Sequence, residues 1–262
     1  GSTEFGYDTT IITRKVSDGV TTTENAHVSS ERSDWTVSID DLTADCTNLK
    51  AASLVVPWFG TDLRCGVCQI RPGVENTAKV TKPEAWEVAG INRAAAHVVS
   101  TYEGKPAFGG TPSDASVIRA IEDLRERGLK IVFYPFVLMD VAGYPWRGRI
   151  TCDPPSVDKT AAVDAQVQNF MNLSEWNYRR FILHYANLCA SAGGVDAFMI
   201  GSELRGLTTL RSSAMAYPFV AALVTLAAEV KAILPTAKIT YGADWSEYFG
   251  HHPQDGSGDV FF

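Results

Sequence analysis

Short apolar runs recur along the chain after residue 50, each long enough for one buried strand. Residues 54–59 form a continuous apolar run that ends at Gly60. Such a run is typical of a strand that is buried on both faces. The other candidate strands, of which the first is the weakest, are residues 96–99, 130–136, 195–201 and 238–242.

Amphipathic helical segments lie between these strands. In residues 113–127 apolar side chains recur at helical spacing, and Gly128 ends the segment. Further helices are predicted at residues 175–192 and 217–234. Helices that alternate with short apolar strands predict right-handed βαβ units and a parallel sheet.

The first fifty residues have a different pattern. Residues 9–23 alternate loosely between apolar and polar positions around a turn, which predicts a hairpin or extended arm. Ser33 is a suitable N-cap for a short helix over residues 34–46. We therefore expect two parts: an N-terminal arm over residues 1–50, and an α/β domain over residues 51–262.

This alternation fits a doubly wound sheet or a (β/α)8 TIM barrel. No glycine-rich phosphate turn follows any candidate strand, as a doubly wound nucleotide-binding fold would require. Polar and aromatic residues instead gather at the C-terminal ends of strands, as in barrels. The sequence therefore favours an α/β, (β/α)8 TIM-barrel-like fold with an N-terminal extension. With five candidate strands, we expect the barrel to be incomplete in this chain.

Charge and cysteine content narrow the class of protein. The chain has 23 Lys and Arg against 30 Asp and Glu, a net charge of −7, which argues against a nucleic-acid-binding protein. The longest strongly apolar stretch, residues 219–228, is too short to span a bilayer, and the N-terminus lacks a signal-peptide pattern. Five cysteines do not form a disulfide framework and fit folding in a reducing cytosol. No cofactor motif is found, so we expect no cofactor.

The sharpest candidate for chemistry is Glu203, which follows a predicted strand. A carboxyl group at the mouth of a barrel, beside aromatic side chains, is suited to general acid catalysis. Asp244 and Glu247 are the candidates for the second carboxylate that glycoside hydrolysis needs. In the alternative interpretation Glu203 pairs with Arg205 or another loop arginine and only orders the rim.

Other polar and aromatic residues lie past the same strand ends. Aromatic rings offer apolar faces for sugars, and arginines suit anionic sugars. The candidate substrate-binding residues are Trp58, Asp62, Arg64, Tyr134, Asp140, Trp146, Arg147, Arg149, Arg205, Trp245 and Tyr248.

Cys65 and Cys68 have the CxxC spacing of zinc or redox sites. A structural zinc site needs four ligands, and no second matching pair exists in the sequence. A redox CxxC is expected at the start of a helix, whereas residues 69–73 continue as a loop. The favoured interpretation is two reduced loop thiols, and no metal site is predicted.

Several sequence blocks carry a resemblance to a known family. They are residues 58–60, 62–66, 70–75, 109–116, 133–140, 147–151, 201–207 and 243–250. Together these blocks resemble the glycoside-hydrolase TIM-barrel-like domain of the large tail-tip proteins (baseplate hub or host-specificity proteins) of gene transfer agents and related tailed phages. The resemblance covers roughly residues 30–262.

The resemblance implies a barrel carried by a virion-like tail, made in the cytoplasm and acting at the surface of the recipient cell. Its partners would be other tail or baseplate proteins and a glycan of the cell envelope, either peptidoglycan or surface polysaccharide. The family pattern sets Glu203 at the end of strand four as the acid/base. The nucleophile of the same glycosidase clan lies on strand seven, which would fall beyond Phe262.

Two functions remain open at this stage. The first is a retaining glycosidase acting on envelope glycan with Glu203 as the acid/base. The second is a barrel that binds glycan or neighbouring tail proteins without cutting, since a fold does not determine an activity. A third, an intracellular metabolic enzyme, lacks any phosphate or cofactor motif.

Overall fold

The computed structural model describes residues 3–154 and 157–261, and the chain divides into two compact units. Unit 1 comprises Gly1–Pro57, Pro72–Phe133 and Asn187–Asp196, and unit 2 comprises Trp58–Arg71, Tyr134–Ala186 and Ala197–Phe262. Residues 1–50 thus share unit 1 with later segments, and the boundary predicted at residues 50 and 51 does not coincide with this division. Within the described residues, no helix combines the length and apolarity needed to cross a membrane.

The N-terminal hairpin and helix form as predicted within unit 1. Strands β1 (Thr13–Ser17) and β2 (Val20–Thr23) pair in antiparallel fashion. Helix α1 (Asp34–Asp45) begins at Ser33, whose side chain accepts a hydrogen bond from the Thr36 backbone. This bond satisfies one of the backbone N–H groups that a helix start leaves unpaired.

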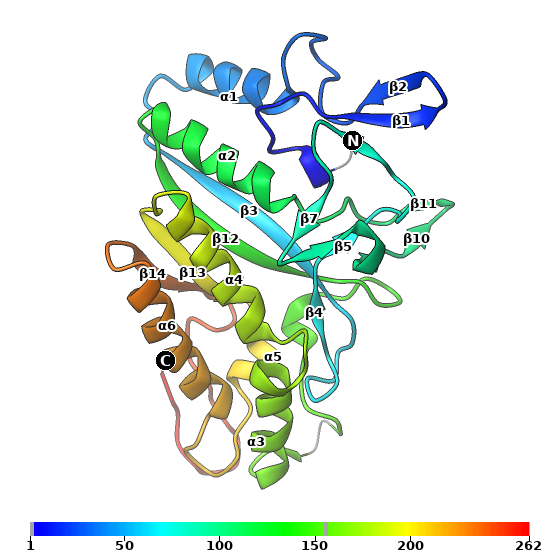
Figure 1. Cartoon of the computed structure of the whole chain (residues 1–262). Coiled ribbons are helices and arrows are strands. Elements are labelled where there is room, and N and C mark those ends of the chain that lie inside the picture. The colour runs from blue at the N-terminus through cyan, green and yellow to red at the C-terminus, as the bar shows by residue number, and fades with distance from the viewer. Residues whose placement is uncertain (1–2, 155–156, 262) are drawn as a thin grey trace. The chain divides into compact units, whose positions relative to one another are not determined.

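Helix α2 (Asp114–Glu126) begins in the same way, with Ser113 as its N-cap. Its apolar stripe, which includes Val117 and Ile121, is buried, and Gly128 ends the helix region with a φ of +73°. The Trp35 indole of α1 donates to the Asp123 carboxylate of α2 at 2.8 Å. These contacts lie within unit 1, where Figure 1 shows α1 and α2.

The segment between β3 and α2 contains short elements that the sequence pattern did not predict. They are β5 (Gly73–Val74), β6 (Thr81–Lys82), β7 (Glu87–Val88), β8 (Ile91–Asn92), the 3-10 helix η2 (Arg93–Ala95), β9 (His97–Val98), β10 (Thr101–Tyr102) and β11 (Lys105–Pro106). Strand β9 pairs only with β5, so the strand predicted at residues 96–99 is wrong as a member of the main sheet. Val98 is 47% exposed, and the segment therefore lacks the two buried faces of an inner strand.

The main sheet has the strand order β14-β13-β12-β3-β4. Its strands are β3 (Ala51–Gly60), β4 (Ile70–Arg71), β12 (Lys130–Met139), β13 (Ala197–Ser202) and β14 (Lys238–Gly242). β13 and β14 are parallel, whereas β4 is antiparallel to β3. The α/β fold class is confirmed, and the sheet does not close into a barrel within the described residues.

Unit 2 contains the C-terminal ends of β3 and β12 together with β4, β13 and β14. Its helical elements are η3 (Arg147–Arg149), α3 (Ala161–Gln168), the π-helix η5 (Asn169–Leu173), α4 (Tyr178–Ser191), α5 (Arg205–Thr208) and α6 (Pro218–Ile233). α6 packs against β13 and β14 (Figure 1). The C-terminal ends of these strands carry the residues described next.

Candidate functional site

Glu203 follows directly on β13 with an unusual backbone conformation. Its φ is +53°, in the left-handed region that side-chain-bearing residues rarely adopt, and its N–H donates to the Gly242 carbonyl at 2.9 Å. Such strain persists only where neighbouring contacts enforce it, and it is frequent at functional sites. The parallel pairing of β13 with β14 thus fixes the position at which the carboxylate leaves the sheet.

The two oxygens of the Glu203 carboxylate differ in their surroundings. Oε2 accepts from Trp146 Nε1 at 2.7 Å and lies 2.9 Å from Arg147 Nη2. Oε1 accepts no hydrogen bond from any residue that the structure describes. The side chain is 34% exposed. Glu203 is therefore held through one oxygen and presents the other to solvent.

Arg147 is the buried support of this arrangement. Its Nε donates to the Ser202 carbonyl at 2.9 Å, and its Nη2 donates to Ser202 Oγ at 3.1 Å. Tyr134 OH donates to the same Ser202 Oγ at 2.6 Å, and the guanidinium lies 3.9 Å from the Phe136 ring centroid. Ser202 and Phe136 were not predicted as site residues, because only the folded chain reveals that Arg147 binds them.

A pocket of about 520 Å³, here called the tryptophan pocket, is lined by Trp146, Arg205, Asp244, Trp245 and Ser246. Trp146 both lines this pocket and binds the catalytic candidate, because its indole N–H donates to the Glu203 carboxylate. Trp245 is 76% exposed, so its ring is available to a ligand. Glu203 forms no ion pair with Arg205 among the described residues. It pairs with Arg147, which is another loop arginine, as the alternative interpretation of the sequence allowed.

The two candidates for a second carboxylate lie in different settings. Asp244 lines the tryptophan pocket, and hydrogen bonds from the Ser246 hydroxyl and N–H to its Oδ2 lower its pKa. Glu247 instead accepts from Thr208 Oγ1 at 2.8 Å, from Tyr241 OH at 3.2 Å and from the Asp244 N–H at 2.8 Å. Asp244 is thus the more accessible of the two carboxylates.

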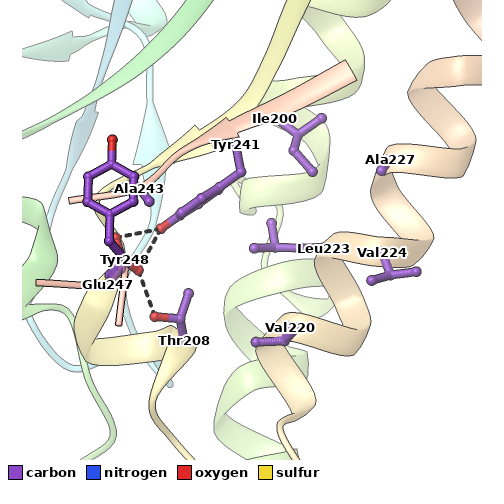
Figure 2. Close-up of a pocket in the computed structure, with 10 residues that line it drawn as sticks. All are labelled: Ile200, Thr208, Val220, Leu223, Val224, Ala227, Tyr241, Ala243, Glu247 and Tyr248. Atoms are coloured by element: carbon purple, nitrogen blue, oxygen red, sulfur yellow. Dashed lines mark hydrogen bonds between the residues drawn. The ribbon is translucent and has the colours of Figure 1, made fainter. Parts of the chain in front are cut away.

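Figure 2 shows a second, apolar pocket of about 400 Å³ between α6 and β14. Val220, Leu223 and Val224 of α6 form one wall, and Tyr241 and Glu247 form the other. The Glu247 carboxylate is already bound by Tyr241 and Thr208, as the dashed lines indicate. This pocket therefore offers little free polar chemistry, and the tryptophan pocket is the better candidate site.

Some predicted site residues lie elsewhere in unit 2. Asp62 forms a bidentate pair with Arg64, with distances of 3.0 and 2.8 Å, and Arg64 lowers the pKa of Asp62. Asp140 follows directly on β12 and donates its N–H to the Gly60 carbonyl at 2.9 Å. Arg149 is exposed in η3, and Tyr248, 73% exposed, lines the apolar pocket. None of these five residues forms a hydrogen bond or ion pair with Glu203 in the part of the chain described.

Trp58 requires a correction, because it cannot bind a glycan. The side chain is fully buried, and its Nε1 donates to Tyr185 OH at 2.8 Å. Its ring packs against Trp176 and Phe181, with centroids 5.7 and 5.0 Å away. Trp58 is a core residue, as its place in a continuous apolar run already allowed.

The CxxC cysteines do not form a metal centre with other described residues. No group of three or more His, Cys, Asp or Glu residues able to hold a metal ion occurs in residues 3–154 and 157–261. Cys65 and Cys68 are both buried, and Cys65 Sγ lies 3.7 Å from the sulfur of Cys152.

Comparison with protein families defines the class of domain. Residues 176–262 match the family model described as the GTA TIM-barrel-like domain, and residues 86–214 match Glycoside Hydrolase Family 113. Each match covers less than half of the chain, and both support a glycoside-hydrolase-like TIM-barrel domain. A search of curated proteins found no match.

Solved structures similar to this chain include three GH113 β-mannanase structures. A complex of a GH113 β-1,4-mannanase is 16% identical, with a TM-score of 0.47, and the match covers 79% of this chain and 49% of the mannanase. AaManA from Alicyclobacillus acidocaldarius in complex with ManMIm is also 16% identical, with a TM-score of 0.43 and coverage of 79% and 48%. This chain spans about half the length of the structures that it matches.

Proposed function

We propose that this chain is the glycosidase-like part of a tail-tip protein that hydrolyses a glycan of the recipient cell envelope, either peptidoglycan or surface polysaccharide. The observation that carries the proposal is Glu203, a strained residue at a strand end whose carboxylate is bound by Trp146, a residue that also lines an open pocket with an exposed tryptophan. The family matches to glycoside-hydrolase and GTA TIM-barrel-like domains support the same class.

In this proposal Glu203 acts as general acid and then as general base. The proton is carried on Oε1, because Oε2 is occupied by Trp146 and Arg147. Glu203 gives this proton to the glycosidic oxygen as the bond to the sugar breaks, and afterwards takes a proton from the attacking water. Trp146 and Arg147 keep the side chain in one orientation through both steps.

Asp244 is the in-chain candidate for the second carboxylate. Its lowered pKa keeps it ionised, as a nucleophile or a stabiliser of positive charge must be. A separation of about 5–5.5 Å between the two carboxyl groups is typical of retention, and about 6.5–9.5 Å of inversion. The alternative is a nucleophile on a later strand of a longer protein.

The competing function is a non-catalytic barrel of the tail baseplate that binds glycan or neighbouring tail proteins. The ion pair between Glu203 and the buried Arg147 favours it, because the pair would also serve a rim that is only structural. In both functions the tryptophan pocket is the contact surface for the glycan.

Release of reducing ends from purified recipient-cell peptidoglycan and from capsule separates the two functions. Release by the wild-type chain that disappears in Glu203→Gln would establish a glycosidase. Saturable binding to the same glycans by both proteins, without release, would contradict the enzyme and support the binding barrel. The assay is run on this chain and on the longest soluble form of the protein that carries it.

Trp245→Ala tests the tryptophan pocket as the glycan-binding surface. We expect glycan binding to weaken by roughly 5- to 10-fold, because the exposed indole supplies a stacking face worth about 1 kcal/mol. Affinity is measured by pull-down on graded amounts of peptidoglycan or capsule. Tyr102→Ala, which removes a similarly exposed aromatic ring from β10, is the matched control and should bind like the wild type. Equal losses in both variants would remove Trp245 from the site.

A further inference from the structure

Two loop segments that each carry a buried cysteine lie side by side in unit 2. Cys65 N–H donates to the Thr151 carbonyl at 2.7 Å, and Thr151 N–H donates to the Leu63 carbonyl at 2.9 Å. Arg64 and Thr151 form an isolated parallel bridge. The backbone of the loop after β3 is thus held at sheet spacing from the segment that ends at Cys152.

The two sulfur atoms face each other across this bridge. Cys65 Sγ and Cys152 Sγ are 3.7 Å apart, and the residues are 0% and 1% exposed. A disulfide has a sulfur–sulfur distance of about 2 Å, so closure needs a shift of less than about 2 Å. The other CxxC cysteine, Cys68, is directed elsewhere, since its thiol donates to the Gln69 carbonyl.

The two thiols differ in reactivity. The hydrogen bond between the two sulfur atoms lowers the pKa of Cys152 and, together with burial, raises the pKa of Cys65. Burial raises the pKa of Cys68 to about 11. Thiolates are the reactive form of cysteine, so Cys152 is the better nucleophile of these three. The residues after it, Asp153 and Pro154, are exposed, so opening of a short surface segment uncovers it.

We propose that Cys65 and Cys152 form an intramolecular disulfide when the protein meets a low-molecular-weight disulfide. The Cys152 thiolate attacks one sulfur of that reagent, forms a mixed disulfide and releases one thiolate. Cys65 loses its proton to solvent and attacks the Cys152 sulfur, which releases the second thiolate. Two protein thiols are oxidised, one small disulfide is reduced to two thiols, and the released protons neutralise the leaving thiolates.

The crosslink joins two segments that are far apart in the sequence. The cysteines are separated by 87 positions, and a disulfide that closes a loop of this size strongly restricts the unfolded chain. Cys152 also lies at the end of the segment that contains η3 and Arg147. Oxidation would therefore link the segment of Arg147, the partner of Glu203, covalently to the loop after β3. The proposal stands independently of the glycosidase function.

The test maps cysteine pairs in the intact chain. Protein purified with reductant is transferred to oxidised glutathione or kept reduced, then digested without reduction and analysed by mass spectrometry. We expect a linked pair of peptides containing Cys65 and Cys152, lighter by two hydrogen atoms, and a midpoint of thermal unfolding about 5–10 °C higher in the oxidised protein. All proteins in this test carry Cys46→Ser, because the exposed Cys46 thiol would otherwise form disulfides between molecules.

Matched variants identify the pair. Cys152→Ser should abolish the link and the thermal shift, whereas Cys68→Ser, which removes a buried thiol from the same loop, should keep both. A Cys65–Cys68 link, a glutathione adduct that stays on Cys152, or four thiols that all remain free after oxidation of the Cys46→Ser protein would each overturn the proposal. Because the mapping is performed on chains that retain Cys65 and Cys152, a variant that fails to fold does not remove the test.

Discussion

Glu203→Gln is expected to lower the rate of glycan hydrolysis by about 10²–10⁴-fold while glycan binding is retained, since a missing general acid or base has an effect of this size. The amide oxygen of glutamine can still accept from Trp146 and Arg147, so the shape of the site is preserved. Unlike a carboxylic acid, however, the amide cannot transfer a proton to the glycosidic oxygen of the leaving group. The rate is measured as reducing ends released per unit time at saturating glycan.

A matched control separates this effect from a general change of charge. Glu175 lies in the same unit with its side chain 76% exposed, and Glu175→Gln should leave hydrolysis unchanged. Asp244→Asn should reduce hydrolysis if Asp244 is the second carboxylate. Glu247→Gln should act mainly on stability, because the amide oxygen can keep the contacts with Thr208 and Tyr241 but the amide nitrogen cannot accept from the Asp244 N–H. Full activity in Glu203→Gln would exclude Glu203 from the mechanism.

Lys79→Met is expected to destabilise unit 1 by about 3–5 kcal/mol, because it leaves buried carboxylates without their shared cation. Lys79 Nζ lies 3.2 Å from Glu4, 2.8 Å from Glu24 and 3.0 Å from Glu75, and its side chain is 2% exposed. Glu4 is fully buried and is also paired with Arg93. The measurement is the midpoint of urea unfolding, and Lys105→Met, at an exposed position in β11, should leave it unchanged.

The same cluster predicts how stability depends on acid. Burial alone would raise the pKa of Glu4, but hydrogen bonds and charge from Arg93 and the charge of Lys79 outweigh it, so the pKa lies below the ordinary value of 4.5. The stability that Glu4 contributes is therefore complete above about pH 4.5 and is lost as the pH falls through the lower, folded value. Without the charge of Lys79 the folded pKa of Glu4 rises, so in Lys79→Met the loss should be smaller and should end at a higher pH. Identical acid profiles for the two proteins would contradict this account.

Local signals in the sequence were sufficient for the capped helices and the inner strands. Ser33 is an N-cap as predicted, the helix predicted from residue 113 begins with Ser113 as its N-cap, and β14 has the predicted bounds of residues 238–242. These elements depend on neighbours in the chain, which a sequence displays directly. The short strands between residues 70 and 106 escaped prediction because two-residue strands form through pairing with distant partners rather than through a pattern of their own.

The candidate site was predicted in part for the same reason. The location of Glu203 at a strand end follows from local pattern, and its contacts with Trp146 and Arg147 join residues that the sequence had set at the same rim. The choice of Arg147 over Arg205, and the contact between Cys65 and Cys152, depend on which loops become neighbours after folding. Trp58 was misassigned because a strand that ends at the rim also carries side chains into the core.

The left-handed backbone conformation of Glu203 lowers the stability of the fold at the position where the proposed chemistry needs a carboxylate. A left-handed residue with a side chain costs about 1–2 kcal/mol, and asparagine is among the residues that tolerate this conformation best. The half-exposed pair with Arg147 offsets at most about 1 kcal/mol of that cost, and Arg147 keeps Ser202 as a partner. Glu203→Asn is therefore expected to keep or slightly raise the midpoint of urea unfolding while abolishing proton transfer. If variants were selected only for resistance to heat, we expect residue 203 to lose its carboxylate early. If variants were selected for activity as well, retention of Glu203 would indicate that the carboxylate is needed for function.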